Sequence, residues 1–253
     1  MRGLNDRNII VTGGGSGIGR AVCRRLADEG ANVGVFDINA EGAQETVALM
    51  SGEGRNSGVF TLDISDYGQC ERSVAEFESQ IGPTDALVNC VGWDKVVPFL
   101  ETEPELWRKV VDINLYGPVN MCRVVLPGMV ERGGGRVVSL SSDAGRVGST
   151  GEAVYAACKG GIIAFTKSIA RELARKGVIL NVVSPGPTDT PLYKESQADA
   201  NPKMSEALIR AIPMRRLGRP EDHAGMVSLL CSDEASYITG QVISISGGLT
   251  MHG

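Results

Sequence analysis

Seven short apolar runs, rich in β-branched residues, are separated along the chain by longer stretches with helical periodicity. The runs are almost continuously apolar and lack the alternation of a strand that has one face in water. Such strands are covered on both faces, as in a parallel sheet between two layers of helices. We therefore expect strands at residues 9–12, 33–37, 59–62, 86–90, 137–140, 179–183 and 242–245.

The regular alternation of strands and helices predicts an α/β fold, a doubly wound sheet of seven mainly parallel strands with helices on both faces. No composition break or internal repeat divides the 253 residues, and a chain of this length can bury one large core. We therefore expect a single catalytic domain over residues 1–253. The polar, proline-bounded stretch at about 191–220 is interpreted as a lid over a ligand site.

Two helix starts are indicated by their sequence. Thr102 and Glu105 have the spacing of a capping box, with Pro104 in the first turn, and Pro220 opens another helix after Arg219.

Composition excludes several classes of function. Acidic residues outnumber basic ones by 30 to 25, so the chain lacks the basic surface that nucleic acid requires. The six cysteines are scattered and include no CxxC pair, which indicates a reducing cytoplasm; we expect no metal site. The sequence contains neither a signal-peptide apolar stretch nor eighteen consecutive apolar residues, so we expect no export and no membrane span.

A glycine-rich turn, TGGGSGIG at residues 12–19, follows the first strand and opens a helical stretch. Glycine permits a tight turn and a close approach of the backbone to a pyrophosphate, which the positive end of the helix attracts. The spacing is TGxxxGxG instead of GxGxxG. The alternative is a tight turn without a ligand. The residues expected at the phosphates are Gly13, Ser16, Gly17, Ile18 and Gly19.

Asp37 ends the second predicted strand, eighteen residues beyond Gly19. A carboxylate at this position accepts hydrogen bonds from ribose hydroxyls and repels a 2′-phosphate. Neither Ile38 nor Gly15 and Ser16 supply the cation that NADP needs, so the sequence predicts NAD as the cofactor. The alternative is a solvated aspartate that caps the next helix.

Tyr155 and Lys159 are spaced i, i+4 on a long helix that begins near Glu152, so they share one face. A nearby ammonium is expected to lower the tyrosine pKa and to make it a usable acid or base. The pair alone is more often a surface coincidence. Ser142, thirteen residues before Tyr155 at the carboxyl end of a strand, makes the combination specific.

With these motifs the chain resembles the short-chain dehydrogenase/reductase family, which has a Rossmann-type sheet, over essentially its whole length. The resemblance implies that Tyr155 exchanges the proton, Ser142 holds the substrate oxygen, Lys159 binds the nicotinamide ribose and Asn114 anchors a water of a proton relay. Hydride passes between the substrate and nicotinamide. Taken alone, Ser142 could be only a strand-end hydroxyl and Asn114 a residue that fills a helix kink.

The same resemblance assigns further cofactor contacts, besides those of Tyr155 and Lys159. The residues concerned are Asp63 and Ile64 at the adenine, Asn89 and Gly92 at the adenosine ribose, and, after Pro185 and Gly186, Thr188 and Thr190 at the carboxamide. One departure is Cys90-Val91-Gly92, where the family usually has Asn-Ala-Gly; it bears on packing near the adenosine ribose and not on catalysis.

The stretches 92–94, 146–153, 187–190 and 246–251 are expected around the substrate cleft and resemble those of 2-hydroxycyclohexanecarboxyl-CoA dehydrogenases within the family. That similarity implies oxidation of an alicyclic β-hydroxyacyl-CoA to the β-ketoacyl-CoA, in breakdown of a ring acid. Trp93 and Leu192 are expected to press on the ring. The expected substrate contacts are Trp93, Asp94, Arg146 and Leu192, with Lys194, Lys203, Arg210, Arg215 and Arg216 as partners for CoA phosphates or as a solvated face.

Other readings remain open. A dehydrogenase of small cyclic alcohols or polyols keeps the chemistry without CoA, and a 3-oxoacyl reductase is a further possibility, opposed by Asp37 because such enzymes generally favour NADPH. An inactive scaffolding subunit is the non-enzymatic alternative, opposed by the intact tetrad. In relatives the long helices around Asn114 and Tyr155, with the last strand, build a tetramer, so we expect a homotetramer.

Overall fold

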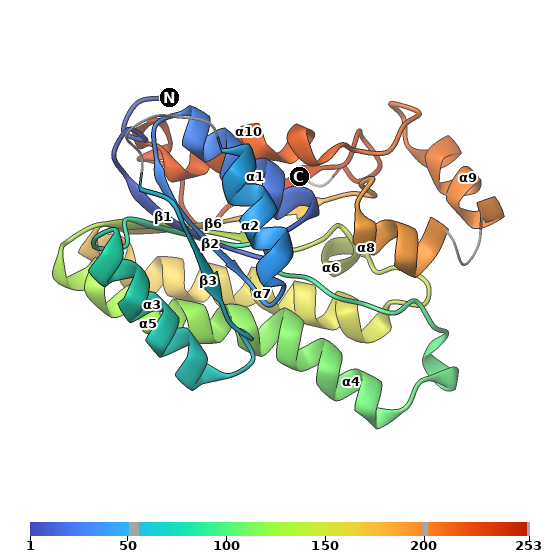
Figure 1. Cartoon of the computed structure of the whole chain (residues 1–253). Helices are drawn as coiled ribbons and strands as arrows, with labels where there is room; N and C mark the ends of the chain where they lie inside the picture. Colours follow the sequence, from blue (N-terminus) through green and yellow to red (C-terminus); the bar gives the residue numbers. More distant parts are fainter. Residues whose placement is uncertain (51–55, 199–201, 252–253) are drawn as a thin grey trace.

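The computed structural model of the chain describes residues 1–50, 56–198 and 202–251 (Figure 1). Its centre is a seven-stranded sheet in the order β3-β2-β1-β4-β5-β6-β7, with every neighbouring pair parallel. This confirms the expected doubly wound α/β fold. The strands are β1 (Asn8–Thr12), β2 (Asn32–Asp37), β3 (Gly58–Thr61), β4 (Ala86–Asn89), β5 (Gly135–Leu140), β6 (Val178–Pro185) and β7 (Val242–Ile245).

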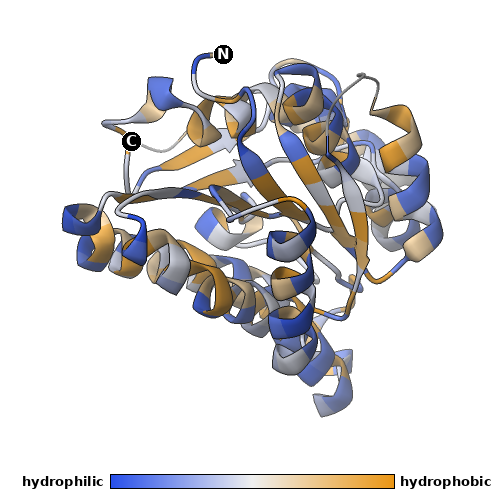
Figure 2. Cartoon of the chain, turned by 60° about the vertical axis from the view of Figure 1, so that its left-hand side comes forward, coloured by the Kyte–Doolittle hydropathy of each residue, from blue (hydrophilic) through white to orange (hydrophobic). Residues whose placement is uncertain are grey.

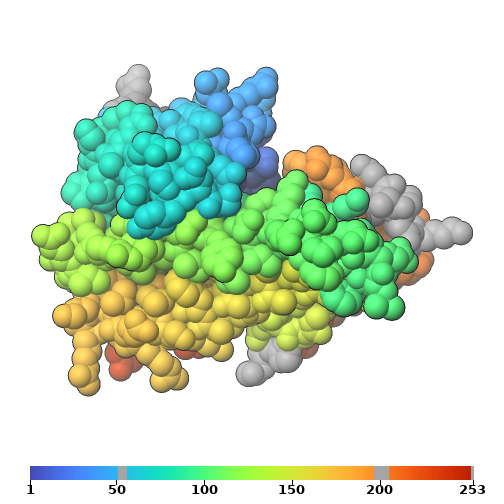
Figure 3. Space-filling model, turned by 90° about the horizontal axis from the view of Figure 1, so that it is seen from below, coloured from blue at the N-terminus to red at the C-terminus, as the bar shows by residue number. Residues whose placement is uncertain are grey.

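Helices cover both faces of the sheet, as the apolar strands require. Alternate strand residues enter different cores: Ile9 and Val11 pack with α1, α2 and α10, whereas Ile10 packs with α3, α5 and α7. The second layer is seen from below in Figure 3, and Figure 2 shows the apolar strands between the layers. These helices are α1 (Gly17–Asp28), α2 (Ala40–Leu49), α3 (Tyr67–Gln80), α5 (Gly117–Glu131), α7 (Ala153–Leu173) and α10 (Pro220–Cys231).

Shorter elements lie at the carboxyl edge of the sheet. They are α4 (Pro104–Val111), a π-helical turn (Asp112–Tyr116) that joins it to α5, α6 (Ala144–Val147), α8 (Pro191–Tyr193) with a second π-helical turn (Lys194–Ala198), and α9 (Pro202–Ala211). Single 3₁₀ turns occupy Phe99–Glu101, Ala174–Lys176 and Asp233–Ala235.

The two expected helix starts had different outcomes. Helix α10 begins at Pro220 with Arg219 as its N-cap, as predicted. The capping box at α4 was wrong, because the N-cap is Glu103 and makes no side-chain capping bond. The Thr102 hydroxyl donates instead to the Phe99 carbonyl and accepts from the Trp107 indole, 2.7 Å in each case.

The strand order determines where a ligand site can lie. From β1 the chain runs outward to β2 and β3, and then returns to place β4 on the other side of β1. In open parallel sheets a crevice forms outside the carboxyl ends of the strands at this reversal. The residues after β1, β4 and β5 therefore meet at one edge of the sheet.

Three expectations about excluded features can be compared with the structure. Within the described ranges, no helix is long and apolar enough to cross a bilayer. Among the residues that the structure describes, no three or more His, Cys, Asp or Glu side chains are grouped so that they could hold a metal ion. All six cysteines are free thiols.

Candidate active site

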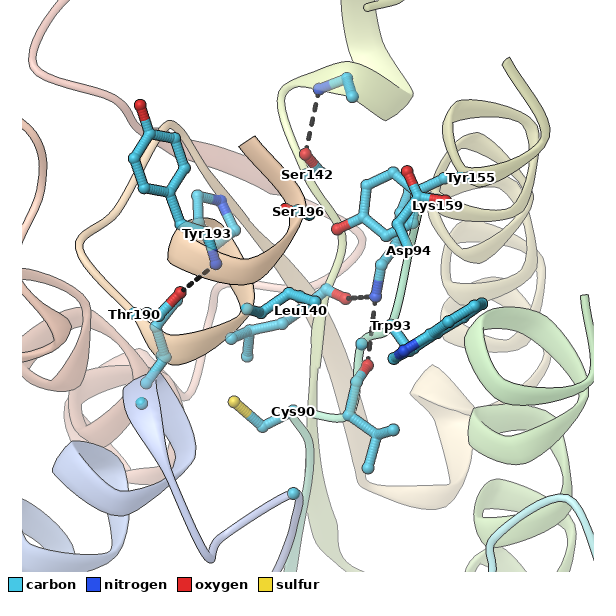
Figure 4. A pocket seen from close by; sticks show the side chains of 18 of the residues that line it. Cys90, Trp93, Asp94, Leu140, Ser142, Tyr155, Lys159, Thr190, Tyr193 and Ser196 are labelled. Atoms are coloured by element: carbon cyan, nitrogen blue, oxygen red, sulfur yellow. Dashed lines mark hydrogen bonds between the residues drawn. The ribbon is translucent and has the colours of Figure 1, made fainter. Parts of the chain in front are cut away.

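A cavity of about 1000 Å³ opens at the carboxyl edge of the sheet. Its wall runs from the glycine turn after β1, past the ends of β2, β4, β5 and β6, to the first turns of α7 and to α8. The close-up in Figure 4 shows side chains from these separate elements converging on it. The lining includes both the glycine turn, predicted to hold phosphates, and Tyr155 and Lys159, predicted to carry the chemistry. One cavity therefore contains both predicted ends of the site.

The glycine turn forms one end of the cavity, where Gly13, Ser16, Gly17, Ile18 and Gly19 all line the wall. Gly13 and Gly17 have positive φ angles of 65° and 49°, which disfavour residues with a side chain. A Cβ on Gly19 would lie 2.0 Å from the Gly13 carbonyl oxygen. The turn therefore needs glycine for its own geometry and leaves backbone N–H groups at the start of α1 open to a phosphate.

Asp37 lines the cavity at the end of β2. Its Oδ2 accepts from the Gly15 backbone N–H at 2.8 Å, and its Oδ1 accepts from the Asn39 N–H at 2.9 Å. Asn39 in turn caps α2 by accepting from Gly42. The structure thus combines both readings of Asp37: it organises the helix start, and it presents a fixed carboxylate to the cavity.

The adenine side is only partly as expected. Asp63 and Ile64 line the cavity, and the Asp63 carboxylate is oriented by bonds from the Ser65 N–H and hydroxyl. Asn89 is not among the lining residues, which corrects its assignment to the ribose. Its buried amide donates to the Cys122 thiol at 3.4 Å and to the Ser139 hydroxyl at 3.3 Å, on the face of the sheet covered by α5.

Ser142 and Tyr155 meet at the chemical end. Ser142 follows β5, and its Oγ accepts from the Ala144 N–H at 3.1 Å, which holds the hydroxyl at the cavity wall. Tyr155 projects from the first turn of α7 and lines the same cavity. Figure 4 shows both side chains in the cavity, with the Ser142 oxygen bonded to the backbone nitrogen of Ala144.

The pKa of Tyr155 differs from the sequence-based expectation. Burial raises the Tyr155 pKa well above its usual value, the Glu152 carboxylate raises it further, and the neighbouring Ser142 hydroxyl opposes the shift. The expected lowering by Lys159 is wrong for this arrangement, because loss of hydration of the phenolate is the larger effect. The tyrosine is therefore held in its protonated form.

Lys159 lies one turn further along α7 and is buried. Its Nζ donates to the carbonyls of Val91 and Leu140, at 3.2 Å each, which follow β4 and end β5 (Figure 4). Burial lowers its pKa to about 8. A Cβ on Gly92 would lie 3.5 Å from Nζ, an ordinary van der Waals contact, so Gly92 lies directly beside the ammonium.

Asn114 is buried in the π-helical turn and does not line the cavity. Its Oδ1 accepts from the Trp93 N–H at 3.2 Å, and its Nδ2 donates to the Trp93 carbonyl at 2.7 Å and to the Val110 carbonyl at 2.9 Å. Asn114 therefore fixes the backbone of the loop after β4. The water that the resemblance assigns to it stays a prediction.

The segment after β6 forms another part of the wall. Pro185, Gly186, Thr188 and Thr190 all line the cavity, as expected. Thr190 also caps α8, because its hydroxyl accepts from the Tyr193 N–H at 3.2 Å.

Three of the four expected substrate contacts line the cavity: Trp93, Asp94 and Leu192. Burial raises the pKa of Asp94 to about 6, and its Oδ2 has no hydrogen-bond partner in the described part of the chain. Arg146 was assigned wrongly. Its guanidinium donates to the Ser244 hydroxyl at 2.7 Å, and Ser244 donates to Asp143, so this side chain ties α6 to β7.

The basic residues of the 191–220 stretch do not surround the cavity. Lys194 pairs with Asp189 at 3.0 Å, and Arg216 pairs with Asp222 at 2.6 Å. Neither lines the wall, nor do Arg210 and Arg215, whereas the side chain of Lys203 lies outside the described residues. The apolar part of this stretch does enter the wall, through Pro191, Leu192, Tyr193, Ser196 and Leu208.

One cation that the sequence analysis missed does line the cavity. Lys109 of α4 places its Nζ 3.9 Å from the centroid of the Trp93 ring, a cation–π contact. The sequence carries no signal for it, since an exposed lysine on an amphipathic helix is the ordinary case.

Comparison with known proteins agrees with this site. A family model described as enoyl-(acyl carrier protein) reductase matches residues 13–250. The chain is 38% identical to an acetoacetyl-CoA reductase of Allochromatium vinosum, over 97% of this chain and 99% of that protein. It is 35% identical to a 3-oxoacyl-[acyl-carrier-protein] reductase of Thermotoga maritima, over 98% and 99%.

Solved structures show the same likeness. Levodione reductase superposes with a TM-score of 0.93 at 34% identity, over 96% of this chain and 97% of that one. A 3-ketoacyl-(acyl-carrier-protein) reductase of Brucella melitensis, complexed with NADH, superposes with a TM-score of 0.90 at 28% identity, over 98% and 100%. Together with the glycine turn and the Ser142, Tyr155 and Lys159 constellation, these matches show that the chain belongs to the short-chain dehydrogenase/reductase family of oxidoreductases.

Proposed function

We propose that the protein uses NAD(H) to interconvert a secondary alcohol and its ketone. The observation that carries this proposal is the meeting of Tyr155 and Ser142 in the same cavity as the glycine turn. NAD, when bound, supplies the carbon that accepts or gives the hydride. Such a site needs one group to exchange the hydroxyl proton and one to hold the oxygen.

Tyr155 exchanges the proton in this scheme. In oxidation the substrate hydroxyl gives its proton to the tyrosine oxygen while the carbinol carbon loses hydride. In reduction the tyrosine returns that proton to the ketone oxygen. Because burial holds Tyr155 protonated, the arrangement is ready for ketone reduction, and oxidation first requires removal of that proton. Ser142 donates to the substrate oxygen and so orients it towards Tyr155.

Lys159 serves both the fold and the ligand. Two of its ammonium hydrogens are taken by the carbonyls of Val91 and Leu140, and the third remains for a ribose hydroxyl. The carbonyls fix the position of the charge, and the charge favours the anionic form of Tyr155 as proton transfer proceeds.

The residues present fit NAD. The glycine turn leaves an open space that side chains at these positions would occupy. The Asp37 carboxylate lies at the end of β2, and each of its oxygens accepts a hydrogen bond from a backbone N–H group. This anion favours two ribose hydroxyls over a 2′-phosphate. We propose NAD as the preferred cofactor on this basis.

For the substrate, we propose a β-hydroxyacyl or β-ketoacyl thioester whose acyl group carries an alicyclic ring. Its support is the similarity to acyl-thioester reductases, together with a substrate end walled by Trp93 and Leu192. Asn114 fixes the backbone of Trp93 and Lys109 contacts its indole, which offers a flat apolar surface to such a ring.

A small cyclic alcohol or polyol without CoA is the second candidate, and two observations favour it. The basic residues Lys194 and Arg216 form ion pairs within the protein and do not face the cavity. In addition, Asp94 lines the cavity, and a carboxylate suits a hydroxyl hydrogen better than a thioester carbonyl. The name of the structural relative levodione reductase mentions no acyl thioester.

One set of kinetic measurements separates the candidates. The purified protein is assayed with NAD and with NADP on ring and linear β-hydroxyacyl-CoA esters, on the matching pantetheine thioesters, and on cyclic alcohols and diols. A kcat/KM at least tenfold higher for ring acyl thioesters than for free cyclic alcohols supports the first candidate, and the reverse order supports the second. Absence of nicotinamide-dependent turnover on all of them contradicts the proposed enzyme and supports a scaffolding subunit.

We also propose a homotetramer, since in relatives of this family α5, α7 and β7 supply the association surfaces. Light scattering of the purified protein tests it: a mass near 107 kDa, four times the 26.7 kDa of one chain, is expected, and a monomer contradicts it.

A further inference from the structure

The Thr188 hydroxyl makes two hydrogen bonds that connect the cavity wall to a buried histidine. Thr188 lines the cavity and is 6% exposed. Its Oγ1 lies 2.8 Å from the Gly186 carbonyl oxygen and 2.9 Å from Nε2 of His223, a residue of α10 that is completely buried. No sequence pattern links these residues, which are 35 positions apart.

The number of available hydrogens determines the direction of both bonds. A carbonyl can only accept, so the single hydroxyl hydrogen of Thr188 goes to Gly186. The bond to His223 must then be donated by the imidazole Nε2–H. Burial lowers the pKa of His223 to about 4, which keeps the ring neutral. Its Nδ1 is consequently unprotonated, and it has no partner among the described residues.

Backbone hydrogen bonds join the segment that contains Thr188 to Gly218, which precedes the helix of His223. The Gly218 N–H donates to the Pro187 carbonyl and the Asp189 N–H donates to the Gly218 carbonyl, both at 2.9 Å. A Cβ on Gly218 would lie 3.1 Å from Thr188 Oγ1 and 3.4 Å from His223 Nε2. Glycine at this position therefore leaves space for the histidine bond at the point where the two ends of the 191–217 stretch meet.

We propose that His223 is a positioning residue for the nicotinamide end of the site. By donating to Thr188 it fixes the hydroxyl, whose remaining lone pair is then available to a hydrogen-bond donor such as the carboxamide N–H of nicotinamide. Without the His223 bond the Thr188 hydroxyl is held only by its bond to Gly186, and the order that is lost must be recovered when the cofactor binds, which weakens binding. This inference rests on the proposed binding of NAD(H).

The test compares two variants of similar size and shape, His223→Gln and His223→Met. Gln retains an N–H donor and Met does not. If only the volume of the side chain mattered, the two substitutions would have the same effect. NADH affinity is measured by fluorescence titration, together with kcat and KM. We expect His223→Met to weaken NADH binding about tenfold and His223→Gln to keep most of the affinity. Glu221→Gln, at an exposed position on the same turn of α10, is the control and should bind as the wild type does.

Coupling to Thr188 provides the second measurement. If His223 acts through Thr188, the double variant Thr188→Val with His223→Met binds NADH no more weakly than Thr188→Val alone. Equal affinities of the wild type and the Met variant, equal losses in the Met and Gln variants, or fully additive losses in the double variant overturn the inference. Failure of the wild type itself to bind NADH contradicts the proposed function instead.

Discussion

The Lys159 ammonium lies 5.5 Å from the centroid of the Tyr155 ring, while its hydrogen bonds go to the carbonyls of Val91 and Leu140. The lysine is thus fixed by the ends of two neighbouring strands, and its charge lies beside the Tyr155 ring. Burial nevertheless keeps Tyr155 protonated. The charge of Lys159 therefore acts against a cost of dehydration.

Replacement of the tyrosine tests the proton exchange directly. We expect Tyr155→Phe to retain NADH binding, because the ring remains, and to lower kcat by about 100- to 10,000-fold, the usual contribution of a general acid or base. Tyr237→Phe, at a fully exposed position, is the control. Wild-type turnover in Tyr155→Phe would exclude the proposed mechanism.

The choice of cofactor depends on the charge of Asp37. Asp37→Asn keeps an oxygen that can accept from the Gly15 N–H and removes the repulsion of a 2′-phosphate. Repulsion between charges about 4 Å apart near a protein surface is on the order of a few kcal/mol, so the ratio of kcat/KM for NAD to that for NADP should fall at least about tenfold. Asp28→Asn, exposed at the end of α1, should leave the ratio unchanged. An unchanged ratio in Asp37→Asn would remove the basis for the NAD preference.

The glycine turn is sensitive to a single methyl group. In Gly19→Ala the new Cβ would overlap the Gly13 carbonyl oxygen, and the turn must shift to relieve it. We expect a loss of about 1–3 kcal/mol of unfolding free energy in urea and a large loss of NADH affinity. Gly225→Ala is the matched control within a helix: its Cβ would lie 3.8 Å from the Arg25 guanidinium, so stability should stay equal or rise by up to about 1 kcal/mol. Equal behaviour of the two variants would show that the turn tolerates a side chain.

The buried histidine predicts how stability depends on pH. The unfolded chain binds a proton at His223 near its ordinary pKa of 6.5, whereas the folded chain does so only near pH 4. The unfolded state therefore holds more protons between these values, and stability is lost as the pH falls from 6.5 to 4. The contribution is about 3 kcal/mol.

Urea unfolding at several pH values measures this contribution as the difference between the wild type and His223→Met. That difference should change by about 3 kcal/mol between pH 6.5 and pH 4, with the wild type losing more stability. Parallel curves would mean that His223 is protonated in the folded protein at the same pH as in the unfolded chain.

Parts of the site were predictable because they follow from local chemistry. The strand positions follow from apolar runs, the turn at Gly13 and Gly17 from backbone angles that only glycine adopts readily, and the Tyr155 and Lys159 pair from helical spacing. Asn89 and Arg146 were misassigned because proximity in sequence does not tell which way a side chain points. Asn89 ends β4 with its side chain on the α5 face, and Arg146 turns towards β7.

The sequence by itself determined the doubly wound sheet, the glycine turn and the Tyr155 and Lys159 pair on one helix face, because each depends on burial pattern or on spacing within one element. Only the tertiary structure decided that burial dominates the Tyr155 pKa, that Lys194 and Arg216 are paired away from the cavity, and that His223 meets Thr188. These are relations between segments far apart in the chain, and they arise only when the sheet edge, α7, α8 and α10 are packed together.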